Sequence, residues 1–170
     1  MRKSIFLALL CIIPALLRAD GGNASDGLTQ EQLHAEVHKS PSCGCCGLWA
    51  EHMQEQGFSV SEVFHDDMVA VKERYEIPAR LQSCHTAKID GYIVEGHVPA
   101  ADIIRLLQER PANAKGLTVP GMPLGSPGME HPRPQSYRTF LILEDGSLKV
   151  FAEHPADGSS TATADHAHDQ

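Results

Sequence analysis

The sequence feature that most constrains the fold is a compact cysteine motif, Cys43-Gly44-Cys45-Cys46, which joins two segments of different periodicity. Residues 33–39 alternate apolar and polar side chains as a strand does, whereas residues 46–56 repeat apolar side chains at helical spacing. Three thiols within four residues are too many for one disulfide, and their closeness suits either thiol exchange or soft-metal binding. The motif therefore predicts a reactive or metal-binding site at a strand-to-helix junction.

The N-terminus has the pattern of a secretory signal. Arg2 and Lys3 precede an apolar run over residues 5–17, and Ala19 is a small residue suited to cleavage. The apolar run is shorter than the roughly twenty residues of a membrane-spanning helix. We therefore expect residues 1–19 to be a cleaved signal peptide, so that the mature chain is periplasmic and has no membrane span.

Cleavage would remove Cys11 and leave four cysteines in an oxidising compartment: Cys43, Cys45, Cys46 and Cys84. Two structural disulfides are hard to draw from this spacing, because the neighbours Cys45 and Cys46 lie too close for an unstrained bond. A functional site is therefore the better interpretation.

The composition divides the mature chain into three parts. Residues 20–32 begin with Gly, Asn, Ser and Asp and indicate a flexible leader, while residues 156–170 lack the apolar content to fold and indicate a disordered tail. Residues 33–155 are enough for one domain with its own core.

Periodicity within this domain predicts an α/β fold in the order β-α-β-α-β-β-α with an added C-terminal β-hairpin. The expected strands cover residues 33–39, 58–64, 81–89, 92–95, 137–143 and 148–151, and the expected helices cover 46–56, a segment from Asp66–Asp67 to Ile77, and 99–111. The Pro- and Gly-rich residues 116–134 predict an irregular loop. This order resembles the thioredoxin fold, and the resemblance implies a cis peptide bond at Pro78, facing the cysteines.

Five short motifs stand in a fixed order between about residues 37 and 151, namely 39–47, 83–87, 90–92, 95–100 and 121–130. Together they resemble the DUF411 family, which includes the periplasmic CopG-type proteins of bacterial copper resistance. The resemblance implies a thioredoxin-like protein that binds or handles copper, with oxidoreductase activity.

The four cysteines have unequal expected roles. Cys43 and Cys46 form a C-x-x-C pair at a helix start, where free N–H groups and the helix dipole stabilise thiolate. Cys43 is then the exposed nucleophile and Cys46 its resolving partner. Cys45 and Cys84 exceed what redox exchange needs, and soft sulfur ligands favour Cu(I). We therefore predict one copper site made of Cys43, Cys45, Cys46 and Cys84.

Other hypotheses stay open at this point. Four cysteines can also bind zinc or an iron–sulfur cluster. The chain can instead be a thiol-disulfide oxidoreductase that needs only Cys43 and Cys46, or a passive copper storage or delivery protein. A periplasmic copper-handling or redox protein is the expected partner, whereas the net charge of −8 gives no electrostatic footprint for nucleic acid.

Four further side chains are candidates for the outer wall of the site, and the sequence leaves each of them open: His85, His97, Met122 and Met129. Along a strand, His85 and Cys84 are expected to point to opposite faces. His97 is expected to orient the turn before the third helix, and His52 to pack on the first helix. His166 and His168 in the tail are left outside the site.

Overall fold

The structure, a computed structural model, describes residues 27–158 and 161–162. The predicted signal peptide and the tail histidines His166 and His168 lie outside the described residues. Among the helices that the structure describes, none is long and apolar enough to cross a membrane.

The described residues form α-helices and strands in the order that the sequence predicts, with two additional strands and one short 3₁₀ helix. The elements are β1 (His34–Lys39), α1 (Gly44–Glu55), β2 (Ser59–Phe64), α2 (Met68–Arg74), η1 (Ala79–Leu81), β3 (Thr86–Ile89), β4 (Tyr92–Glu95), α3 (Ala100–Glu109), β5 (Ala114–Thr118), β6 (Tyr137–Leu143), β7 (Leu148–His154) and β8 (Thr161–Ala162). The fold is therefore α/β, and its order is compatible with a thioredoxin-like frame. The two-residue strand β8 lies within the segment for which the sequence predicts no fold.

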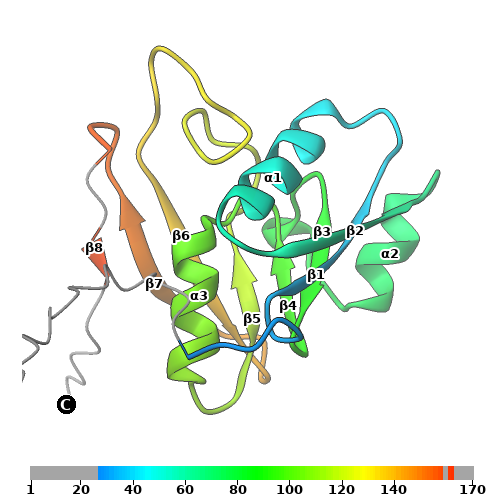
Figure 1. Ribbon diagram of the computed structural model, residues 1–170, viewed down its shortest axis with the longest axis vertical. Coiled ribbons are helices and arrows are strands. Elements are labelled where there is room, and N and C mark those ends of the chain that lie inside the picture. The colour runs from blue at the N-terminus through cyan, green and yellow to red at the C-terminus, as the bar shows by residue number, and fades with distance from the viewer. Residues whose placement is uncertain (1–26, 159–160, 163–170) are drawn as a thin grey trace, which may run out of the picture.

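One mixed sheet carries the whole structure, with the spatial order β2-β1-β3-β4-β5-β6-β7-β8 (Figure 1). β1 is parallel to β2 and β4 is parallel to β5, while the other neighbours are antiparallel. The predicted C-terminal hairpin is present as β6 and β7 and extends the sheet beyond β5.

Strand alternation divides the side chains between the two faces of the sheet. On one face, Val37 packs in the main core with Trp49 and Met53 of α1 and Leu106 of α3. On the other face, the next residue, His38, accepts or donates a hydrogen bond at 3.0 Å with the hydroxyl of Tyr75, just beyond α2. Thus α1 and α3 cover one face, and α2 lies toward the other.

Each of the three α-helices that the structure describes begins within two residues of its predicted start. Asp67 caps α2, because its Oδ1 accepts the N–H groups of Val69 and Ala70 at 2.9 and 3.2 Å. α1 begins at Gly44 instead of residue 46, which places Cys45 and Cys46 in its first turn. The predicted helix over 99–111 is α3, which begins after Pro99 and ends before Pro111.

Three expectations about the middle of the chain are wrong. The expected strand over 81–89 starts only at Thr86, and residues 82–85 form a bend. The peptide bonds of the described residues are all trans, so Pro78 is not cis, and it instead precedes η1. The expected loop over 116–134 begins with strand β5, which pairs in parallel with β4.

Candidate metal centre

Four cysteines, Cys43, Cys45, Cys46 and Cys84, meet at one place, the N-terminal end of α1. Their sulfur atoms all lie within 4.8 Å of one another. Cys43 and Cys46 are joined by a disulfide with a Cα–Cα separation of 5.4 Å, while Cys45 and Cys84 are free thiols. Cys45 Sγ lies between the two halves of the cluster, 3.6 Å from Cys43 Sγ and 3.9 Å from Cys84 Sγ.

The local sequence explains how α1 presents three of these sulfurs. The residues after β1 turn sharply, and the Cys43 N–H donates to the Ser40 carbonyl at 3.1 Å. Cys43 then occupies the N-cap position without a capping side-chain hydrogen bond. Free N–H groups in the first turn of a helix and the helix dipole favour negative charge there. A thiolate of this motif is therefore formed in a favourable electrostatic position.

The fourth sulfur comes from a distant part of the chain. Cys84 lies in the bend just before β3, and burial among its neighbours, with Cys45 next in importance, raises the pKa of its thiol to about 12. The metal-free thiol is therefore protonated at neutral pH, and a metal ion that binds there displaces a proton.

Two histidines lie beside Cys84, and the sequence alone leaves the role of each open. His97 Nε2 lies 2.9 Å from Cys84 Sγ, and His85 Nδ1 lies 3.4 Å from the same sulfur. One ligand atom from each of the three residues lies within 4.8 Å of the others. The His85 ring lies on the same side as the Cys84 sulfur because residues 82–85 form a bend. The strand alternation expected from the sequence therefore does not apply to these two side chains. The proximity of His97 arises because β4 pairs with β3 and returns the chain to the same end of the sheet.

Both imidazoles are held in the neutral form. His97 Nδ1–H donates to the Pro127 carbonyl at 2.8 Å, which leaves the Nε2 lone pair facing Cys84. Burial lowers the pKa of His97, and burial also holds the pKa of His85 well below its usual range, with neighbouring cations such as Lys72 acting in the same direction. Among the described residues, His85 Nε2 is the one buried side-chain nitrogen or oxygen without a hydrogen-bond partner.

The Pro- and Gly-rich loop lies beside α1 (Figure 1). Gly128 has φ +78°, and a Cβ there would stand 2.7 Å from Trp49 N and 2.8 Å from Cys45 O. The loop therefore packs directly on the first turns of α1, and Pro127 is placed to orient His97. Of its two methionines, Met122 is exposed and Met129 is partly buried.

His52 serves a structural contact of a different kind. Its Nε2 accepts the Ala100 N–H at 3.3 Å, at the first residue of α3. It thus links α1 to α3 and is not among the side chains gathered at Cys84. The sequence placed His52 on α1 but gave no signal for this contact.

Comparison with known proteins supports the connection to copper. Residues 81–129 match the family described as "Protein of unknown function, DUF411". Two solved structures, "Copper resistance protein copG- Form 1" and "Form 2", are each 46% identical to the chain, with a TM-score of 0.68. The matches cover 73% and 72% of this chain and 98% of each solved chain. The comparison with curated proteins finds no match. The identity over nearly the whole solved chain, with a family match across both Cys84 and His97, shows that this protein belongs to the DUF411 family, together with the copper resistance protein CopG.

Proposed function

We propose that the chain is an exported copper-binding protein that holds copper, chiefly Cu(I), through Cys43, Cys45, Cys46 and Cys84. The solved relatives are named copper resistance proteins, which supports copper as the metal and export as the setting. The observation that carries the proposal is the mutual approach of the four sulfurs to within 4.8 Å, from two segments far apart in sequence.

The donor set fits copper better than its rivals. Thiolates are soft ligands that select Cu(I), and closely spaced thiolates can bridge more than one ion. Neutral imidazoles such as His97 suit copper as well, and the Pro127 carbonyl fixes this ring by its far nitrogen, as is typical of metal-binding histidines. The geometry therefore supports a soft-metal site with sulfur at its centre and imidazole at its edge.

The disulfide supports a link between copper binding and redox state. Metal binds to thiolate, and the Cys43–Cys46 disulfide withholds two of the four sulfurs. Two-electron reduction of this bond by two external thiol groups, which are oxidised to a disulfide, frees the two missing thiol ligands. Copper capacity is therefore expected to rise on reduction.

The disulfide also favours a second candidate function, a thiol-disulfide oxidoreductase that uses Cys43 as nucleophile and Cys46 as resolving thiol. Cys46 is completely buried whereas Cys43 is partly exposed, which suits this division of roles. Disulfide reduction in a model protein substrate without copper tests it. Turnover that persists in Cys45→Ser and Cys84→Ser would favour the oxidoreductase over the copper site.

The main experiment is a Cu(I) titration of the mature protein, reduced and oxidised, against a competing chelator. We expect the reduced protein to hold copper and the oxidised protein to hold less. Cys45→Ser and Cys84→Ser should each lower the capacity or the affinity. Failure of reduced wild-type protein to retain Cu(I), or unchanged binding in both variants, contradicts the four-cysteine site.

A further inference from the structure

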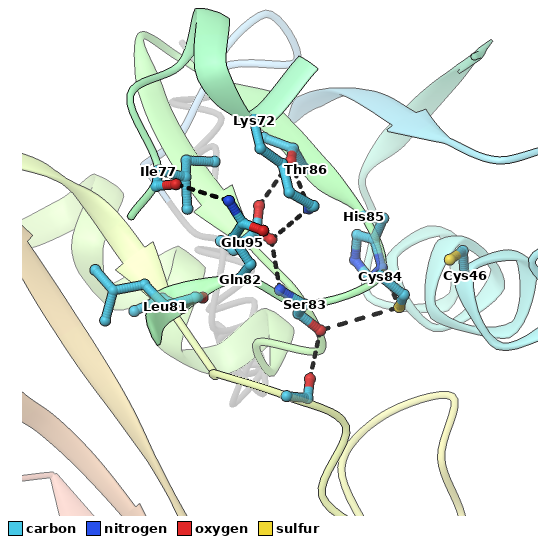
Figure 2. A network of polar contacts seen from close by, with 12 residues as sticks. Cys46, Lys72, Ile77, Leu81, Gln82, Ser83, Cys84, His85, Thr86 and Glu95 are labelled. Atoms are coloured by element: carbon cyan, nitrogen blue, oxygen red, sulfur yellow. Dashed lines mark hydrogen bonds and ion pairs between the residues drawn. The ribbon is translucent and has the colours of Figure 1, made fainter. Parts of the chain in front are cut away.

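A buried carboxylate contacts the bend that carries Cys84. Glu95 is the last residue of β4 and is completely buried. Its Oε1 accepts from Lys72 Nζ at 2.5 Å and from the Ser83 N–H at 2.7 Å, and its Oε2 accepts from the Thr86 hydroxyl at 2.6 Å. Figure 2 shows these contacts converging on Glu95 from α2, β3 and the bend that carries Cys84.

Stability alone does not explain why this network contains a buried ion pair. Lys72 and Glu95 are both buried, and removing two charges from water costs several kcal/mol per ion. Replacement of such pairs by apolar side chains is often neutral or stabilising. What an apolar side chain cannot supply is an acceptor for the Ser83 N–H, one residue before Cys84.

The bend that carries Cys84 is not held by the backbone hydrogen bonds of a helix or a strand. Residues 82–85 lie between η1 and β3 and belong to neither element. The Ser83 hydroxyl donates to the Gly121 carbonyl, which ties the bend to the loop that also carries Pro127. The bend therefore depends on contacts from the end of β4 and from this loop.

Three consecutive residues at the end of β4 contact three consecutive residues of the bend. Glu95 accepts from the Ser83 N–H, the Gly96 N–H donates to the His85 carbonyl at 3.0 Å, and His97 faces Cys84 at 2.9 Å. A Cβ at Gly96 would stand 2.5 Å from the Ser83 side chain, so the two segments are in direct contact. Glu95 is the member of this set whose side chain reaches the backbone of the bend.

We propose that Glu95 is the positioning residue of the metal centre, because its carboxylate fixes the Ser83 N–H and thereby holds Cys84 Sγ against the sulfurs of α1. The inference rests on the copper-binding function proposed above. Lys72 neutralises the buried charge, and the acceptor oxygen positions the thiol.

Two double variants separate the acceptor from the charge. Lys72→Met/Glu95→Gln removes both charges and keeps an oxygen that can accept from Ser83, whereas Lys72→Met/Glu95→Leu removes the charges and the acceptor. We expect the Gln variant to retain the Cu(I) affinity of the reduced wild type, and the Leu variant to lose roughly tenfold or more, in the range found when partners of metal ligands are removed. Equal affinity of the two variants would overturn the proposal.

A second pair of variants approaches the same hydrogen bond from its donor, in case the Leu variant does not fold. Ser83→Pro removes the N–H, and the preceding Gln82, at φ −70° and ψ 146°, has the extended backbone that a residue before proline adopts. Ser83→Ala keeps the N–H and loses only the hydroxyl. Lower Cu(I) affinity in Ser83→Pro than in Ser83→Ala supports the proposal, and equal affinity contradicts it.

Two further measurements exclude a merely structural effect. In a Cys84→Ser background, the Leu and Gln variants should bind Cu(I) equally, since no thiol remains to be positioned. Asp102→Asn is the matched control, because Asp102 is also a buried carboxylate that accepts a threonine hydroxyl at 2.6 Å, in this case Thr139. A difference that persists without Cys84, or an equal loss in Asp102→Asn, would overturn the positioning role.

A readout without copper keeps this proposal separate from the proposed function. In the metal-free protein with its Cys43–Cys46 disulfide intact, alkylation of Cys84 is followed by peptide mass spectrometry. The Leu variant should label Cys84 several-fold faster than the Gln variant, because the bend is released. If wild-type protein binds no Cu(I), the copper function fails, and the labelling rates alone decide whether Glu95 positions Cys84.

Discussion

His97 Nε2 faces Cys84 Sγ at 2.9 Å, while the opposite nitrogen of the same ring donates to the Pro127 carbonyl at 2.8 Å. The loop over residues 119–136 thereby sets which nitrogen of His97 carries the proton. A thiol from before β3, an imidazole from after β4 and a carbonyl from the distant loop thus form one chain of contacts. Through these contacts, the loop that carries Pro127 determines how His97 meets the cysteines at α1.

Removal of the His97 ring is expected to weaken copper binding. His97→Ala should lower the Cu(I) affinity of the reduced protein by about 10–100-fold, because the lone pair that faces Cys84 and the link to Pro127 are lost together. Competition with a chelator measures the change. His131→Ala, at an exposed histidine of the loop, is the control and should bind as wild type does. Unchanged affinity in His97→Ala would remove His97 from any account of the site.

Packing of the loop on α1 is expected to depend on Gly128. In Gly128→Ala, the new methyl group sits on a residue with a positive φ and also collides with the backbone of Trp49 and Cys45. The collision should lower the free energy of unfolding by about 1–3 kcal/mol beyond the cost of the positive φ. Gly121→Ala is a matched control, since Gly121 has φ +71° and nothing within 4 Å, so that only a backbone cost of about 1–2 kcal/mol applies. Urea unfolding of both variants measures the difference, and equal losses would show that the loop does not rest on α1.

Acid is expected to weaken the contact between α1 and α3. Burial lowers the pKa of His52, so the folded state binds a proton less readily than the unfolded state. This contribution to stability is therefore present above about pH 6.5 and is lost as pH falls below it. His52→Gln keeps an oxygen that can accept the Ala100 N–H and should show a smaller fall in thermal unfolding temperature between pH 7 and pH 5. A fall as steep as that of wild type and of His131→Gln would contradict this role for His52.

The thiol of Cys84 is expected to react slowly with an alkylating reagent. In the protein with its disulfide intact, iodoacetamide at pH 8 should modify Cys84 slowly, because burial raises the pKa of its thiol to about 12. Raising the pH should speed the labelling of Cys84, since alkylation proceeds through thiolate. Peptide mass spectrometry follows the reaction, and unfolded protein, in which Cys84 is no longer buried, is the control. Rapid labelling of folded Cys84 at pH 8 would contradict the protection of its partly buried thiol.

Much of the fold is predictable because its signals are local. Asp67 caps α2 as expected, and the turn at Asp90–Gly91 joins β3 to β4 with the expected strand bounds for β4. β5 is not predictable in the same way. Gly116 lies in its middle, and a Cβ there would stand 1.8 Å from the Ile93 carbonyl. The glycine that looks like a loop signal is needed for close strand approach, a contact that only the folded sheet reveals.

The grouping of the four sulfurs was predictable from the sequence, and the side chains around them were less so. The spacing of Cys43, Cys45 and Cys46 indicates a cluster, and Cys84 joins it in the structure. His85 was expected to point away because alternation assumes a strand, and the bend breaks that assumption. The contact between Glu95 and Ser83 has no sequence signal, because it depends on the register of β3 and β4 and on a lysine from α2.

The β3–β4 hairpin makes the number of residues between Cys84 and His97 a fixed dimension of the site. Thr86 pairs with Glu95 at the open end, and Ile89 pairs with Tyr92 beside the turn. One residue added at the turn would retain every cysteine and histidine of the candidate site and every core side chain in the sequence. It would nevertheless shift β4 by one position and turn its side chains to the opposite face. The length of this turn therefore constrains the candidate site in the same way as the identities of Cys84 and His97 do, because a chain with the same cysteines and a longer turn would place Glu95 and His97 differently.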